Sequence, residues 1–197
     1  MKIIDLGKAT FVLFLIIFGT SLLAILLMKM RPIWNEQALK ITRDGIIVGL
    51  ILWYVMKNHL VKIQPLNFKL DGMALVAGLI VVTGATLLAP DEEMQLLPYQ
   101  FLQIVVFAPI MEEVICRGVI FGNYAANHLM LATIVSTVIF VGLHFSRNPV
   151  DLLEFTLVSL ILCCVQFTTG NVFNCIMIHS LLNIYLLVGN QILKGFT

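Results

Sequence analysis

Long apolar stretches, each close to the length of a membrane-spanning helix, recur along the chain. A helix needs about 20 mostly apolar residues to cross the hydrocarbon core of a bilayer, which is about 30 Å thick. Stretches of about this length are separated by short segments rich in proline, glycine, asparagine or charge, which are helix stops. They cover residues 9–28, 72–89, 99–123, 128–145, 152–168 and 172–193. The pattern predicts a bundle of membrane-spanning helices.

A further stretch, residues 45–56, is shorter and reaches full length only if Lys57, His59 and Lys62 are included. We interpret it as a weak second span that tilts, lies partly in the interface, or extends its lysines toward water. With this uncertainty, about six to eight spanning helices are expected. Lysine and arginine are divided almost evenly between the two sides, so the orientation in the membrane stays open.

The composition agrees with a membrane protein. Hydrophobic residues make up 60% of the chain and charged residues 12%, with a mean hydropathy of +1.01; an average soluble domain is about 25% charged. Only helices and closed barrels satisfy their backbone in lipid, and the alternating pattern of barrel strands is absent. We therefore expect an all-α fold, a polytopic transmembrane helical bundle in which residues 1–197 form a single integral membrane domain.

The sequence argues against a cleaved signal peptide and against a nucleic-acid partner. The first apolar stretch is longer than the core of a secretory signal peptide and has no small-residue cleavage site, so we interpret it as a retained helix. The net charge of +1 and the lack of a basic run argue against a nucleic-acid partner. The lipid bilayer is the expected environment.

Polar groups inside apolar stretches carry the functional information, because each is costly in lipid and needs a reason. Glu112, Glu113 and Arg117 interrupt an otherwise apolar stretch. Glu113 and Arg117 are four residues apart and can pair on one helical face. Glu112 points about 100° away and is free for proton transfer.

Two later stretches add histidines and an amide. His144 ends one of them, and the last contains His179 and Asn183, again four residues apart. Hydrolysis of an amide needs an activated water, a stabilised oxyanion and a proton for the leaving amine. Glu112 and His144 are candidates for the base and the proton shuttle, and His179 and Asn183 for the oxyanion donors.

The order E-E-x-x-x-R, F-x-x-x-H and H-x-x-x-N on successive apolar stretches resembles the CPBP intramembrane proteases. That family includes the CAAX prenyl endopeptidases and the bacterial Abi-type proteins, some of them linked to bacteriocin processing or immunity. The resemblance covers about residues 99–187, and the short chain favours the bacterial Abi-type branch. The positions that match are Glu112, Glu113, Arg117, Phe140, His144, His179 and Asn183.

The resemblance implies an intramembrane endopeptidase that cleaves a membrane-associated peptide or protein, as a multi-pass protein of a bacterial cell membrane. It also implies that Glu113 and Arg117 hold the site together. A divalent metal such as zinc is one option, with Glu112, His144 and His179 as candidate ligands. A water activated by glutamate without a metal is the other, and no H-E-x-x-H zinc signature is present.

Two alternatives stay open. A non-catalytic immunity or scaffold protein could keep the fold and bind a peptide or receptor. A proton-coupled transporter also needs intramembrane Glu and His, although the chain has no paired inverted repeat to support it.

Overall fold

The computed structural model describes residues 3–30, 36–61, 68–88 and 98–194, and all the regular secondary structure in these ranges is helical. The expected all-α class is therefore confirmed. Two of the segments are π-helical and are labelled η. The elements are α1 (Ile3–Met30), α2 (Glu36–Lys57), α3 (Phe68–Leu88), α4 (Pro98–Leu102), η1 (Gln103–Phe107), α5 (Ala108–Glu113), η2 (Val114–Phe121), α6 (Gly122–Leu143), α7 (Pro149–Thr169) and α8 (Val172–Lys194).

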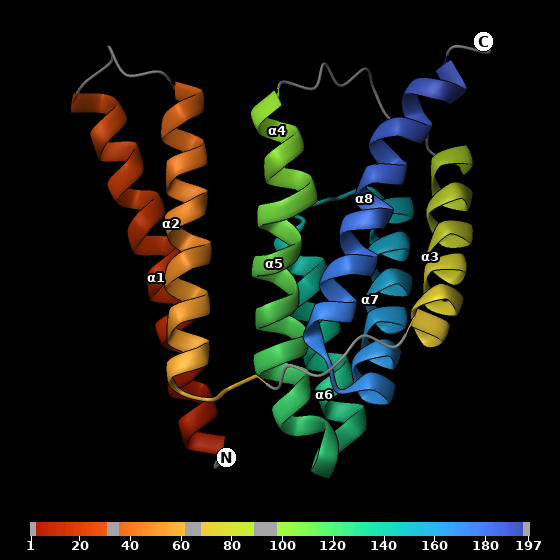
Figure 1. Cartoon of the computed structure of the whole chain (residues 1–197), viewed down its shortest axis with the longest axis horizontal. Helices are drawn as coiled ribbons and strands as arrows, with labels where there is room; N and C mark the ends of the chain where they lie inside the picture. The colour runs from red at the N-terminus through yellow and green to blue at the C-terminus, as the bar shows by residue number, and fades with distance from the viewer. Residues whose placement is uncertain (1–2, 31–35, 62–67, 89–97, 195–197) are drawn as a thin grey trace.

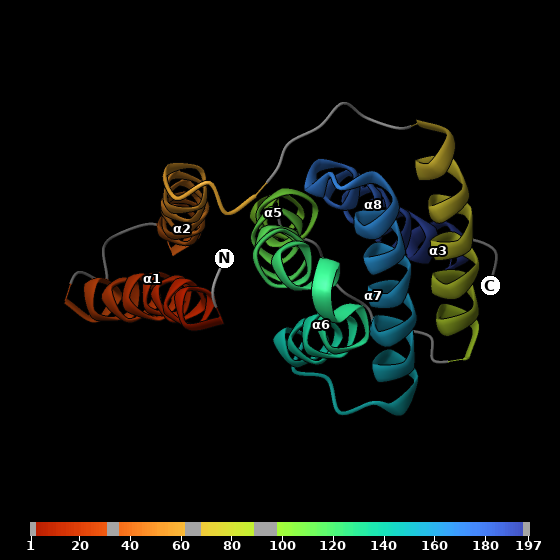
Figure 2. The ribbon, with the colours of Figure 1, turned by 90° about the horizontal axis from the view of Figure 1, so that it is seen from below.

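The helices lie side by side in one bundle, with their axes roughly parallel or antiparallel (Figure 1). The continuous run from α4 through η2 forms a central rod. The α1–α2 hairpin contacts one side of this rod, whereas α6, α7 and α8 surround the other side. α3 packs against α7 and α8, on the far side of the bundle from α2, which precedes it in the chain (Figure 2).

The outer surface of the bundle is apolar along much of its length. Phe14 of α1, Ile80 of α3, Met130 of α6 and Phe167 of α7 are each more than half exposed. Large apolar side chains spread over several helices are unusual on a soluble protein and suit contact with lipid. By length and hydropathy, residues Gly7–Leu26 and Pro149–Thr169 qualify as membrane spans, and Gly72–Leu88 and Val172–Val188 are shorter apolar helices. Two qualifying spans do not establish the expected number, which stays a prediction.

The weak second stretch is part of a longer helix than the sequence pattern indicated. α2 has 22 residues and begins at Glu36, well before Gly45, where the apolar run starts. Its first half carries charged side chains, including the adjacent pair Arg43 and Asp44. The hydropathy pattern therefore located only the C-terminal half of this helix.

Two predicted helix breaks are confirmed. The Asn148 side chain accepts a hydrogen bond from the backbone N–H of Val150 at 3.0 Å and caps the start of α7, with Pro149 in the first turn. Gly170 ends α7 in the left-handed conformation, with φ of 65°. The other predicted breaks, at residues 31–32, 64–65 and 90–93, lie outside the described residues.

The central rod changes its helical pitch beside a proline. At the end of η1 the N–H of Ala108 bonds to the carbonyl of Gln103, five residues earlier, which is the π-helical pattern. The next residue, Pro109, has no N–H to continue that pattern to Ile104. A proline in a helix interior disrupts the regular hydrogen bonding on its N-terminal side, and this accounts for the irregular segment in front of α5.

Candidate active site

Glu113 and Arg117 form the buried ion pair that their spacing predicted. Arg117 Nη1 lies 3.2 Å from Glu113 Oε1, and both residues are 0% exposed. Arg117 Nη2 donates to Ser159 on α7, to Oγ at 2.7 Å and to the backbone carbonyl at 3.2 Å. The guanidinium also lies over the ring of Phe140 on α6, 4.2 Å from its centroid. One arginine thus joins the central rod to α6 and α7.

Glu113 also forms a hydrogen bond with a residue of the last helix, α8. The same oxygen that contacts Arg117 lies 2.8 Å from Nδ1 of His179 on α8. A carboxylate paired with arginine only accepts hydrogen bonds, so Nδ1 of His179 carries the proton. The other ring nitrogen, Nε2, is then left for chemistry. The sequence did not predict this bond, because it links positions 66 residues apart.

Glu112 faces His144, as expected from its different direction on the helix. Glu112 Oε2 lies 3.8 Å from Nε2 of His144, and the two side chains are 11% and 20% exposed. His144 caps the end of α6, and its Nδ1 lies 2.8 Å from the carbonyl oxygen of Phe140. A carbonyl only accepts, so this Nδ1 also carries the proton and Nε2 faces the glutamate with a lone pair.

Aromatic rings hold His144 from two sides. The ring of Phe155 on α7 lies 4.0 Å from the imidazole, centroid to centroid, and the ring of Phe140 lies 4.7 Å away. Phe140 also contacts His179 at 5.5 Å. Phe155 and Ser159 are neighbours of the candidate site that sequence reasoning missed. They are four residues apart on α7 and face the site together, but nothing in an apolar helix distinguishes a contacting Phe from a lipid-facing one.

Glu112, His144 and His179 converge from three separate elements. One carboxylate oxygen and one ring nitrogen from each histidine all lie within 4.8 Å of one another. Two histidines and a glutamate are a donor set used by catalytic zinc sites that keep an open position. In metal sites, the ring nitrogen of histidine that does not bind the metal usually donates a hydrogen bond that orients the ring. Here Nδ1 of His144 bonds to the Phe140 carbonyl, and Nδ1 of His179 bonds to Glu113. Among the described residues, buried Glu112 Oε2 has no hydrogen-bond donor. The residues present therefore fit a divalent metal ion.

Asn183 lies one turn beyond His179 on α8, but it is not a member of this cluster. Its Nδ2 donates to the backbone carbonyl of Ile104 in η1 at 2.7 Å. An asparagine amide has two N–H donors, so one is used by the backbone and one is left. The spacing of His179 and Asn183 does put both side chains on the face of α8 that meets the central rod.

Comparison with known proteins adds one match. Residues 94–185 match the family described as Type II CAAX prenyl endopeptidase Rce1-like. This segment contains all six polar residues singled out from the sequence: Glu112, Glu113, Arg117, His144, His179 and Asn183. No curated protein and no solved structure matches the chain.

Proposed function

We propose that the chain is an intramembrane endopeptidase of the Rce1-like type that residues 94–185 match, and that Glu112, His144 and His179 are its peptide-hydrolysing residues. The proposed substrate is a membrane-associated peptide or protein. The observation that carries the proposal is the convergence of one glutamate and two oriented histidines within 4.8 Å, inside an apolar bundle. Ionisable groups at such a position are costly and mark function by default.

In the proposed reaction Glu112 is the general base. A water held between Glu112 Oε2 and His144 Nε2, which are 3.8 Å apart, loses a proton to the carboxylate as its oxygen attacks the substrate carbonyl. The peptide C–N bond then breaks, and the proton passes to the leaving amine from Glu112, with His144 as the shuttle. The partial exposure of the His144 side chain supports this assignment, because substrate and water must reach the pair.

Glu113 and Arg117 are proposed to position the cluster. Both are fully buried, so neither touches a substrate, and both connect the central rod to other helices. Glu113 fixes the ring of His179 through Nδ1. Removal of either residue would release His179 or leave an unpaired buried charge.

Two roles are open to Nε2 of His179, as an oxyanion donor or as a metal ligand. As an imidazolium, His179 donates its Nε2–H to the oxyanion, with the second N–H of Asn183 as a companion donor. As a metal ligand, its Nε2 binds a divalent ion together with Glu112 and His144. That ion would polarise the carbonyl and acidify a bound water. Since Nε2 cannot donate and ligate at once, metal dependence separates the two.

We further propose that the chain is a single multi-pass domain of a bacterial membrane, with about six to eight spans. The apolar outer surface of α1, α3, α6 and α7 supports a lipid-facing bundle. The alternative of a non-catalytic immunity or scaffold protein is an outcome of the test below.

The test compares the peptide termini of membrane and secreted fractions from host cells carrying the wild type, Glu112→Gln or Glu36→Gln. Glu36→Gln makes the same chemical change at an exposed position of α2. Termini that are present with the wild type and Glu36→Gln but absent with Glu112→Gln, at equal protein levels, support proteolysis and name the substrate. Identical termini in all three, together with a phenotype on deletion, would reject the enzyme and favour the scaffold.

A further inference from the structure

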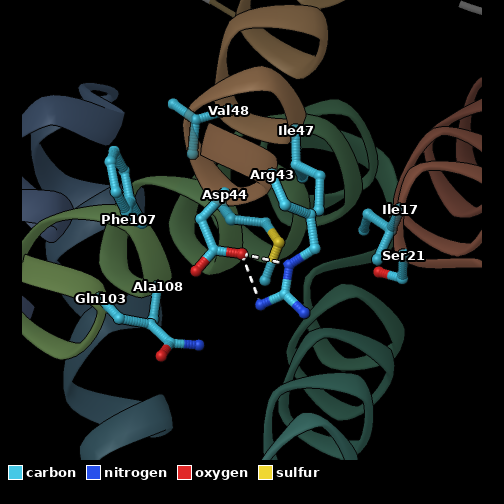
Figure 3. A pocket seen from close by; sticks show the side chains of 10 residues that line it. Ile17, Ser21, Arg43, Asp44, Ile47, Val48, Gln103, Phe107 and Ala108 are labelled. Carbon is cyan, nitrogen blue, oxygen red and sulfur yellow. Dashed lines mark hydrogen bonds and ion pairs between the residues drawn. The ribbon is translucent and has the colours of Figure 1, made fainter. Parts of the chain in front are cut away.

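A cavity with a charged pair in its wall lies on the other side of the central rod from the candidate active site. It has a volume of about 170 Å³ and is enclosed by α1, α2, η1 and α5. Its polar side chains are Arg43, Asp44, Gln103 and Ser21, and its apolar wall includes Ile17 and Phe107 (Figure 3). None of the residues proposed for hydrolysis lines it.

The charged pair in this cavity leaves binding groups free. Arg43 Nε and Nη2 lie 2.7 and 2.6 Å from Asp44, and both contacts fall on the same oxygen, Oδ1. Asp44 Oδ2 and Arg43 Nη1 have no partner among the described residues. Figure 3 shows the pair in the middle of the cavity, with Gln103 on one side and Ser21 on the other. The site therefore offers an acceptor and a donor side by side, with no net charge.

The pair also lies at a polar–apolar boundary along α2. The charged residues of the first half of the helix end with Asp44, and the next residues are apolar until Lys57. A second cavity, of about 100 Å³, lies against Arg43 between α1 and α2. It is almost entirely apolar, with Leu23, Ala24, Leu39 and Ile46 in its wall. Arg43 thus lies in the wall of both the larger cavity, which contains the charged pair, and the apolar slot.

We propose that these two neighbouring cavities, with Arg43 in the wall of both, bind one membrane phospholipid with a zwitterionic, amine-bearing headgroup, such as phosphatidylethanolamine. Its phosphate would take the free N–H groups of Arg43, and its ammonium would donate to Asp44 Oδ2. Its acyl chain would begin in the apolar slot between α1 and α2. A purely anionic headgroup would satisfy Arg43 but leave Asp44 without a donor, so charge complementarity favours the zwitterion. This inference is independent of the proposed hydrolysis.

The test is lipid retention by the purified chain, measured by native mass spectrometry after titration with palmitoyl-oleoyl phosphatidylethanolamine, -choline or -glycerol. We expect phosphatidylethanolamine to be retained about tenfold more tightly than phosphatidylcholine, the change produced by one charge-assisted hydrogen bond. Phosphatidylcholine has the same charges but no N–H to donate. Equal retention of these two lipids, or stronger retention of phosphatidylglycerol, would overturn the proposal.

Variants at Arg43 and Asp44 test whether the lipid binds in this cavity. Asp44→Asn keeps the shape and an acceptor oxygen but removes the charge, so it should reduce the preference for the ethanolamine lipid. Glu36→Gln, an acid-to-amide change outside the cavity, should keep the tenfold preference. Arg43→Gln should weaken both lipids, with Lys40→Gln as its matched control. An undiminished tenfold preference in Asp44→Asn would place the lipid elsewhere and reject this site.

A comparison within the wild type needs no variant. Retention should fall mainly at the third methylation of the ethanolamine nitrogen, because the first two leave an N–H that can donate to Asp44 and the third removes the last one. An unchanged retention across the methylated series would reject the contact with Asp44, even if the variants fail to fold.

Discussion

Asn183 Nδ2 donates to the backbone carbonyl of Ile104 and so supplies the hydrogen bond that Pro109 cannot make. In the π-helical pattern of η1 the N–H five residues after Ile104 would belong to Pro109, which has none. A side chain of α8 therefore completes the backbone of the central rod, just before the two glutamates. This gives Asn183 a structural role besides the oxyanion role inferred from its spacing to His179.

Replacement of Asn183 by Ala should destabilise the protein by about 1–3 kcal/mol, because the Ile104 carbonyl loses its donor. Pro109→Ala restores a backbone N–H to this turn, so the double variant should recover part of that loss. Thermal unfolding in detergent of the two single variants and the double variant measures the coupling. Strictly additive losses would show that Asn183 does not compensate for the proline.

Replacement of Arg117 by Met should destabilise the bundle by about 3–5 kcal/mol, because Glu113 would be left as an uncompensated buried charge. Adding Glu113→Gln to that variant removes the charge, so the double variant should be more stable than Arg117→Met alone. Expression level and unfolding temperature both report this order. A double variant less stable than the single one would mean that Arg117 matters through Ser159 and Phe140 rather than through Glu113.

Replacement of Phe155 by Leu should lower the rate of hydrolysis about tenfold, because the imidazole of His144 loses the ring that holds it against Glu112. The change keeps an apolar side chain, so stability should fall by only about 1 kcal/mol. Phe167→Leu is the matched control, since Phe167 lies on the exposed side of the same helix. The measurement is kcat on the substrate identified from the termini, and equal rates for both variants would exclude a positioning role for Phe155.

Co²⁺ should bind to the wild-type cluster, and Glu112→Gln should weaken that binding at least about tenfold, as expected when one of three ligands is changed. The visible absorption of Co²⁺ measures the binding in detergent. Activity after chelation then assigns His179 Nε2. Loss of activity with recovery on adding Zn²⁺ makes the nitrogen a ligand, and activity that survives chelation makes it an oxyanion donor. Equal Co²⁺ binding by wild type and variant would reject the cluster as a metal site.

The sequence predicted contacts within a helix better than contacts between helices. The bond from Arg117 to Glu113 follows from a spacing of four residues, since the helical period brings such positions together. The bond from Glu113 to His179 depends on how α5 and α8 pack. Apolar periodicity in a membrane helix does not fix that packing, because lipid and protein neighbours are equally apolar.

The same limit explains two features of the fold. α2 was predicted too short because Arg43 and Asp44 lower the hydropathy of its first half, although both side chains find a partner in each other. η1 and η2 were not predicted, because a change from α to π pitch leaves no mark on an apolar pattern beyond Pro109. The positions of the helix stops at Asn148–Pro149 and Gly170 were predicted, since capping depends on local sequence.

The position of α3 has a consequence for biosynthesis. α3 packs against α7 and α8, where Gly78 lies close to the side chain of Leu182, and Thr83 hydrogen-bonds to Tyr185 at 2.8 Å. Both partners leave the ribosome only after the whole central rod and α6 have been made. During that interval the packing face of α3 must be held by lipid or by an insertion factor. Assembly of this bundle is therefore completed only once translation has reached its last helix.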